Sequence, residues 1–357
     1  MNAYVINILL IMFWAMALLL FNPNKLKKKA FIAIASIQWI FVSGLRNITS
    51  GADPDTIEYL RHFNSVKNMP WSKIPALFYN TYIKGVGKDP GYTVLVKLVQ
   101  VFTKNYQCYL VIVAIILFSS LAVWVYKNSK MPCFSYILFS TLFYSFFAVT
   151  GIRQTIATAL VVFIGTELIK KRKFFPFLLI CLIAFTIHKS SICLLPFYFI
   201  SQKKITRKYI LFVLALLPIV AVFRNQFLDL LNFISGYEYE ELSTSGAKGF
   251  TFFYFVIVIV SLILLRYVRE NSKNYKMYYN ALFLGMLFIP LVFVNPSLMR
   301  VVQYFSVYLM LLVPELIMCT QKKYRNLVYI AIVIVLMIIT NIYTCLLYTS
   351  PSPRDCS

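Results

Sequence analysis

Two arginines and one histidine are the candidate catalytic residues of a chain of 357 residues. Arg153 lies in a short turn beside Gly151 and Gln154, Arg300 begins an apolar run, and His188 lies between two apolar runs. A guanidinium binds two phosphate oxygens at once, so these arginines predict a diphosphate ligand. Histidine, with a pKa of about 6.5, can take a proton from a hydroxyl. Alternatively, arginines at span ends bind lipid headgroups, and a lone histidine at a helix end is only a satisfied polar group.

Seven further polar residues are predicted to bind substrate, and they are Arg46, Asp53, Asp55, Tyr59, Gln154, Ser190 and Tyr304. Asp53, Asp55 and Glu58 form an acidic cluster that could bind a divalent ion or activate a sugar hydroxyl. The alternative for Asp53 is that it caps a helix, whose first turn favours acidic residues.

The elements that hold these residues belong to a membrane protein. Mean hydropathy is +0.75 and only 13% of the residues are charged, whereas soluble domains carry roughly 25%. The apolar runs are too long and uniform for barrel strands. The sequence predicts an all-α, polytopic bundle of about twelve transmembrane helices in one domain, residues 1–347. Residues 348–357 resemble a translated sequencing adapter, and we expect them to be a non-native tail.

The predicted spans lie near residues 3–21, 30–45, 106–126, 133–150, 153–169, 174–187, 190–201, 208–224, 250–266, 277–294, 301–318 and 326–347. Basic residues give their orientation, because cytoplasmic loops retain Lys and Arg. More than half of the 35 Lys and Arg residues fall in alternate connections, from 22–29 to 319–325. Those connections should be cytoplasmic, and both termini should be external.

The connections 46–105 and 225–249 are then the large external segments. Asp89-Pro90 has the form of a helix start, with Asp as the cap and Pro in the first turn. The apolar residues that follow are predicted to form one face of an amphipathic helix on the membrane surface or over the bundle, and they are Val94, Leu95, Leu98, Val99 and Phe102. Segment 225–249 is the predicted mobile lid.

Residues 174–201 form a predicted hairpin with His188 and Lys189 at its tip. Each arm rises only about 20 Å at ~1.5 Å per residue. The tip should therefore lie below the external surface, in a recess lined by protein, because a tip facing lipid would leave polar groups unsatisfied.

The sequence lacks the motifs of several classes of enzyme, among them nucleotide hydrolases, dinucleotide-dependent enzymes and zinc proteases. The sequence has no Walker motif, Rossmann glycine pattern, GxSxG, HExxH or CxxC, and its seven cysteines are scattered through apolar runs. We expect no nucleotide, metal or other cofactor. A pI near 9.7 reflects the basic loops of a membrane protein, and we expect no nucleic-acid partner.

The polar residues resemble, in order, the motifs of the EpsG family of Wzy-like polymerases. These elements are Arg46; Gly51-Ala-Asp53-Pro-Asp55 with Tyr59; Asp89-Pro-Gly91-Tyr92; Gly151-Ile-Arg153-Gln154 with Ala157; Phe185-Thr-Ile-His188-Lys-Ser190-Ser191; and Arg300 with Tyr304-Phe305. The resemblance runs from about residue 40 to 315, most of the chain.

The resemblance implies a glycosyltransferase of the bacterial inner (cytoplasmic) membrane that needs neither metal nor nucleotide. Such enzymes join oligosaccharide repeat units carried on undecaprenyl diphosphate, at the external face, and release undecaprenyl diphosphate. Arg153 and Arg300 would bind the diphosphate, with Arg46 as a third contact, and His188 would be the general base. A flippase and a chain-length regulator are the implied partners.

Three other activities use similar residues. A glycan ligase would also need external arginines and a histidine, and a lipid-linked oligosaccharide transporter or flippase would also need many spans. An acyltransferase using His188 is the third alternative, although it would normally take its acyl donor from the cytosolic side.

Overall fold

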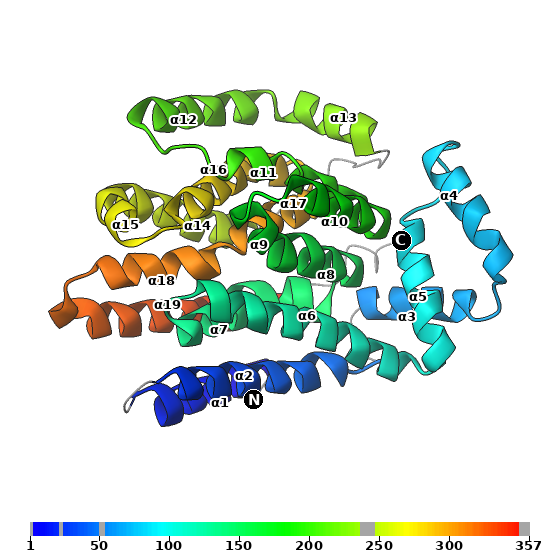
Figure 1. The fold of residues 1–357 in the computed structure, drawn as a ribbon, viewed down its shortest axis with the longest axis horizontal. Coiled ribbons are helices and arrows are strands. Elements are labelled where there is room, and N and C mark those ends of the chain that lie inside the picture. Colours follow the sequence, from blue (N-terminus) through cyan, green and yellow to red (C-terminus); the bar gives the residue numbers. More distant parts are fainter. Residues whose placement is uncertain (1–2, 21–23, 50–53, 236–246, 350–357) are drawn as a thin grey trace.

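The computed structural model describes residues 3–20, 24–49, 54–235 and 247–349, and all regular structure within them is helical (Figure 1). The first half of the chain contains α1 (Ala3–Ala15), η1 (Met16–Leu20), α2 (Lys25–Gly44), α3 (Pro54–Val66), η2 (Trp71–Lys73), α4 (Ile74–Tyr82), α5 (Pro90–Phe102), α6 (Tyr106–Asn128), α7 (Pro132–Leu138), η3 (Phe139–Phe143), η4 (Ser145–Val149), α8 (Ile152–Thr158), η5 (Ala159–Ile164) and α9 (Gly165–Lys170). The predicted all-α fold is confirmed.

The second half contains α10 (Phe174–Ile187), η6 (Lys189–Leu194), α11 (Phe197–Ile200), α12 (Arg207–Val222), α13 (Arg224–Ser235), α14 (Ala247–Ile263), α15 (Leu265–Asn271), α16 (Tyr275–Val292), η7 (Pro296–Leu298), α17 (Met299–Ser306), α18 (Leu309–Cys319) and α19 (Lys322–Thr349). Segment 225–249, the predicted lid, begins as helix α13, and its residues 236–246 lie outside the described residues. The predicted tail, 348–357, lies outside them from residue 350 onward.

Three described helical segments are long and apolar enough to cross a bilayer, and they are Tyr106–Asn128, Ile152–Lys170 and Tyr275–Val292. Three bent pairs raise the number to six in the described part of the chain: α12 with α13, α14 with α15, and α17 with α18, bent by 85°, 70° and 52°. Shorter apolar helices lie at several other predicted spans. Length and composition thus support a polytopic membrane protein with three to six spans, and the total of about twelve stays a prediction.

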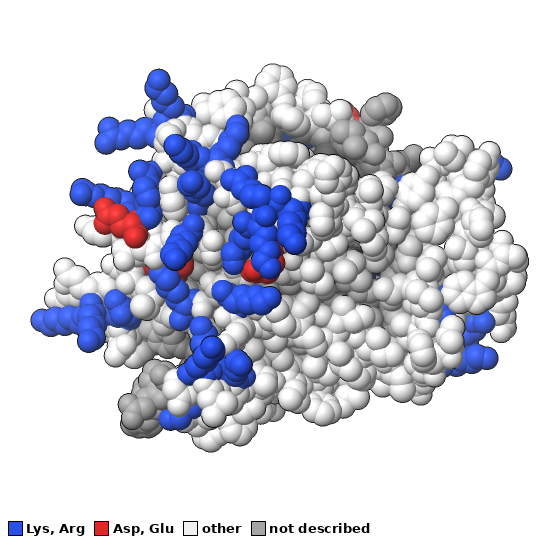
Figure 2. Space-filling model, in the orientation of Figure 1, with Lys and Arg blue, Asp and Glu red and all other residues white. Residues whose placement is uncertain are grey.

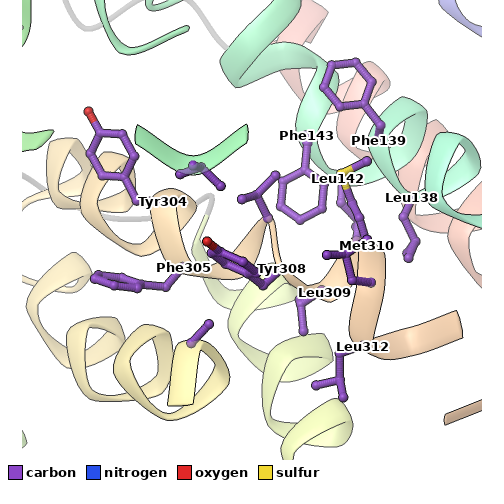
Figure 3. Packing of buried hydrophobic residues seen from close by; sticks show 14 of the residues in the cluster. Leu138, Phe139, Leu142, Phe143, Tyr304, Phe305, Tyr308, Leu309, Met310 and Leu312 are labelled. Carbon is purple, nitrogen blue, oxygen red and sulfur yellow. The ribbon is translucent and has the colours of Figure 1, made fainter. Parts of the chain in front are cut away.

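One large hydrophobic core joins the two halves of the bundle. Figure 3 shows η3 and the α17–α18 segment contributing side chains to it, among them Phe139, Phe143 and Tyr308. Within this core, Trp124 Nε1 donates to Thr166 Oγ1 at 3.0 Å, and Thr166 shares a 2.8 Å hydrogen bond with the Tyr308 hydroxyl. Such bonds connect helices where no water can satisfy a polar group.

The two ends of the bundle differ in charge. Figure 2 shows Lys and Arg gathered over the end where Figure 1 places α15 and the α18–α19 junction. Glu315 is buried there in a 2.6 Å ion pair with Lys130. The opposite end carries α3, α4 and α5, and we call it the capped end. The sequence predicted this separation, and the assignment of the capped end to the outside stays a prediction.

The predicted apolar face of α5 is divided between the bundle and its outside. Leu95 and Val99 pack partly against the hydrophobic cluster of the capped end, whereas Leu98 is 52% and Phe102 87% exposed. The close approach of α5 to α10, where a Cβ on Gly91 would overlap the Thr186 side chain, turns the buried Tyr92 side of the helix inward. The predicted face is thus confirmed in part, and its contact with the membrane surface stays a prediction.

Candidate functional site

Arg153 is carried to the capped end by a sharp turn between two helices. The π-helical segment η4 ends at Val149, and Gly151 then adopts a left-handed conformation with φ of +60°. Glycine adopts this conformation without the steric cost that a side chain brings. The turn is held by Thr155, whose hydroxyl donates to the Phe147 carbonyl at 2.8 Å. Arg153 therefore projects from the first turn of α8.

A single buried carboxylate links the predicted catalytic residues. Arg153 Nη1 donates to Asp89 Oδ2 at 2.7 Å, and His188 Nδ1 lies 3.6 Å from the same oxygen. The Lys189 backbone N–H donates to Asp89 Oδ1 at 3.3 Å. The Asp89 side chain is 1% exposed and that of Arg153 is 27% exposed. Three segments distant in sequence therefore meet at Asp89.

Asp89 does not have the role predicted from its place before Pro90. It has a left-handed backbone, with φ of +47° and ψ of +60°, and its side chain makes no capping hydrogen bond to α5. The prediction of a helix cap was wrong, because the carboxylate turns instead toward α8 and η6. The Asp89-Pro-Gly91-Tyr92 element was visible in the sequence, but its spacing does not identify Arg153 as the partner.

The charge of Asp89 is stabilised by these partners. Burial on its own raises the pKa of the Asp89 carboxyl, but contacts with His188, Arg153 and the Lys189 N–H outweigh burial and hold that pKa below its usual range. The Arg153 guanidinium also lies over the rings of Tyr59 and Tyr92, at 5.7 Å and 6.0 Å. Such positions attract a cation to the ring face. Arg153 is thus held by a carboxylate and two aromatic rings.

Arg300 lies on the other side of the α8 turn. Its Nη2 is 3.8 Å from Asp55 Oδ2, and the Gly151 backbone N–H donates to that same oxygen at 3.4 Å. Gln154 Nε2 donates to the Arg300 carbonyl at 2.9 Å. Arg300 is the more exposed of the two arginines, at 38% of its side chain. Asp55 and Gln154 therefore bridge the Arg153 turn to the start of α17.

His188 lies in the turn between α10 and η6, and its side chain is buried by protein, as the hairpin prediction required. Two residues further, Ser190 shares a 3.3 Å hydrogen bond with the hydroxyl of Tyr304 from α17. Tyr304 is itself fully buried. This bond fixes η6, and with it the His188 turn, against the helix that begins near Arg300.

Arg46 lies beside the site and is occupied by structural bonds. Its guanidinium donates to the carbonyls of Ser43 and Ala148 at 2.9 Å and 3.2 Å, and to Thr56 Oγ1 at 3.3 Å. It therefore ties α2 to η4 and α3. Asp53 lies outside the described residues.

The predicted acidic cluster does not stay together among the described residues. Asp55 faces Arg300, whereas Glu58 forms an exposed ion pair with Arg61 on α3. Within the described ranges, no three His, Cys, Asp or Glu side chains are grouped to hold a metal ion. The predicted site residues that come together are thus Arg153, Arg300, His188, Asp55, Tyr59, Gln154, Ser190 and Tyr304. Asp89 and Tyr92, which were not among the predicted site residues, join them.

Comparison with known proteins gives one match. The EpsG family model matches residues 29–350, which include every described residue of the site. No match is found among curated proteins or among solved structures.

Proposed function

The chain belongs to the EpsG family, whose members serve exopolysaccharide biosynthesis, and from this premise we propose that it is a polysaccharide polymerase. Its substrates would be oligosaccharide repeat units carried on undecaprenyl diphosphate, embedded in the same membrane. It would transfer the growing chain from its lipid carrier to the incoming unit at the external face.

The proposed reaction is a glycosyl transfer. The acceptor hydroxyl oxygen forms a bond to the anomeric carbon of the donor chain, and the bond from that carbon to the diphosphate breaks. The electron pair leaves with undecaprenyl diphosphate, and His188 takes the proton from the acceptor hydroxyl. Because negative charge develops on the leaving diphosphate, preorganised donors such as Arg153 and Arg300 stabilise the transition state.

One observation carries this proposal: Arg153 and His188 come from separate segments and meet at Asp89, and Arg300 is joined to the Arg153 turn through Gln154. A base and two guanidiniums at one end of a bundle match the two needs of the reaction, proton removal and stabilisation of a diphosphate. The lipid diphosphate is already an activated donor, so the proposed reaction requires no nucleotide. The two guanidiniums supply the positive charge that a metal ion would otherwise bring.

The remaining predicted residues have roles that follow from their positions. Tyr59 lies under the Arg153 guanidinium and Asp55 lies beside Arg300. In the proposed reaction both would contact sugar hydroxyls next to the diphosphate. Ser190 and Tyr304 would position the His188 turn. A flippase that delivers repeat units and a regulator of chain length are the partners that this activity would require.

The direct test is incubation of the purified protein with a defined lipid-linked repeat unit. We expect a ladder of products that differ by one repeat unit. In the His188→Gln variant we expect single lipid-linked repeats to accumulate, with a loss of rate of about 10²–10⁴-fold, because general base catalysis is removed. Movement of the lipid-linked unit across the bilayer without any ladder would contradict the proposal and support a flippase.

A glycan ligase is separated from a polymerase by the acceptor. A ligase would leave the repeat units unjoined until a different acceptor is added, whereas the polymerase forms the ladder from repeat units alone. The same assay with and without the second acceptor therefore decides between the two.

A further inference from the structure

The most buried charge of the site is negative, which the binding of a diphosphate does not by itself explain. Asp89 is 1% exposed and accepts from Arg153 Nη1 at 2.7 Å. A carboxylate oxygen at this distance takes the place on the guanidinium that a phosphate oxygen would take. A diphosphate oxygen that binds Arg153 Nη1 must therefore displace Asp89 from that nitrogen.

Asp89 also has contacts that remain when Arg153 moves away. The Lys189 N–H holds its other oxygen, Oδ1, at 3.3 Å, and His188 Nδ1 lies 3.6 Å from Oδ2. A small movement would turn the His188 contact into a full hydrogen bond. Arg153, with 27% of its side chain exposed, can turn toward the surface of the capped end.

We propose that Asp89 is a positioning residue that competes with the substrate diphosphate for Arg153. In the empty site Asp89 holds the guanidinium in place. When the lipid diphosphate binds, Arg153 passes to it and Asp89 keeps the His188 ring oriented. After transfer, Asp89 takes Arg153 back and so promotes release of undecaprenyl diphosphate. This inference rests on the proposed function for the identity of the diphosphate.

The left-handed backbone of Asp89 makes a clean test possible. Among residues other than glycine, Asn and Asp tolerate this conformation best. Asp89→Asn keeps the backbone preference, the side-chain volume and an oxygen for the Lys189 N–H. It removes the negative charge and puts an amide NH2 in place of Oδ2, the acceptor of the Arg153 bond. The fold should therefore survive, whereas Asp89→Ala would also remove the side chain that fills this buried position and accepts from the Lys189 N–H.

The first measurement is the affinity for farnesyl diphosphate, a soluble lipid diphosphate, by calorimetric titration of the full chain in nanodiscs. Asp89→Asn should bind it about tenfold more tightly, because an intramolecular competitor for a charge-assisted bond is lost. With lipid-linked repeat units, the variant should show a lower KM and a lower kcat, because product leaves slowly. Structural damage would raise KM instead.

The second measurement asks whether Arg153 carries the effect. Arg153→Gln alone should weaken diphosphate binding, and in the Arg153→Gln background Asp89→Asn should no longer tighten it. If Asp89→Asn tightened diphosphate binding equally with and without Arg153, Asp89 would act by long-range repulsion of the diphosphate. That result would contradict the proposed competition for Arg153. The control is Glu58→Gln, which removes a carboxylate paired with Arg61 on exposed α3; it should leave affinity and turnover unchanged.

The two proposals fail in different ways. If the wild-type protein forms ladders but Asp89→Asn binds farnesyl diphosphate no more tightly, the competition is wrong and the polymerase stands. If the wild-type protein forms no ladder, the polymerase is wrong, and the titration still decides whether Asp89 and a diphosphate compete for Arg153.

Discussion

Gln154 Nε2 donates a 2.9 Å hydrogen bond to the backbone carbonyl of Arg300, a residue 146 positions further along the chain. Gln154 is buried and follows Arg153 directly on α8. The bond therefore fixes the start of α17 against the start of α8. Together with Asp55, this amide sets the distance between the two candidate diphosphate ligands.

Replacing Gln154 by Met should separate the two arginines without removing either charge. The partly buried Arg300 carbonyl would lose its donor, at a cost of about 1–3 kcal/mol. We expect KM for the lipid-linked repeat to rise, because both guanidiniums must contact one diphosphate. The measurement is the ladder assay over a range of substrate concentrations.

A second glutamine gives the matched control. Gln38 Nε2 donates to the Asn7 carbonyl at 2.9 Å, which joins α2 to α1, two helices that carry neither Arg153 nor Arg300. Gln38→Met should cost similar thermal stability and leave KM unchanged. A rise of KM in both variants would contradict the role assigned to the Gln154 bond.

We expect that a lysine at position 153 cannot perform the function of Arg153. Arg153 combines a hydrogen bond to Asp89 with contacts to two aromatic rings, and a lysine ammonium lacks the planar fork for this arrangement. We expect Arg153→Lys to lower kcat/KM by about tenfold or more, which corresponds to about 1.4 kcal/mol of transition-state stabilisation. Arg61→Lys, at an exposed pair with Glu58, should match the wild-type protein.

The sequence predicted the helical fold and the residues of the site better than it predicted their contacts. Polar residues are costly near a membrane, so those that lie between apolar runs are informative whatever the exact fold. Arg153, His188 and Arg300 were found in this way, and the structure brings them to one end of the bundle.

Asp89 shows why the contacts could not be predicted. An Asp before Pro is a common helix start, and this local signal concealed a bond that spans 64 residues. The orientation of α5 could not be predicted for a related reason: hydrophobic periodicity marks the apolar side of a helix but does not distinguish protein from lipid as its neighbour. Leu98 and Phe102 point away from the bundle, while Tyr92 packs into it.

Gly91 should be the residue of α5 that least tolerates a side chain. An added Cβ would overlap the Thr186 side chain and lie 2.8 Å from the Thr186 backbone carbon. Overpacking of this kind costs about 1–3 kcal/mol, so Gly91→Ala should lower the melting temperature and displace Asp89 at the start of the helix. Thermal unfolding in nanodiscs measures the effect.

The control uses another glycine of the capped end. Gly85 has no heavy atom within 4 Å of an added Cβ, and its φ of +69° is one that Asn tolerates. Gly85→Asn should therefore unfold close to the wild-type temperature. If the Gly91→Ala protein were as stable as this control, the close packing of α5 on α10 would be wrong.

Acid should loosen the packing of α3 on α5 through His62. This ring stacks on Tyr92, with ring centroids 5.2 Å apart, and its Nε2 lies 3.3 Å from Thr93 Oγ1. Burial lowers the pKa of His62, and the nearby Arg153 charge lowers it further. The folded protein thus favours the neutral ring, and protonation favours the unfolded state.

The sign of the pH effect follows from this shift. Because the folded pKa of His62 lies below its unfolded value of about 6.5, its contribution to stability is full above that pH and is lost as the pH falls below it. The melting temperature of the wild-type protein should therefore decline as the pH is lowered from 7.5 to 5.5. His62→Phe keeps an aromatic ring on Tyr92 but cannot be protonated, so its decline should be smaller. An equally steep decline in both proteins would assign the acid sensitivity to another group.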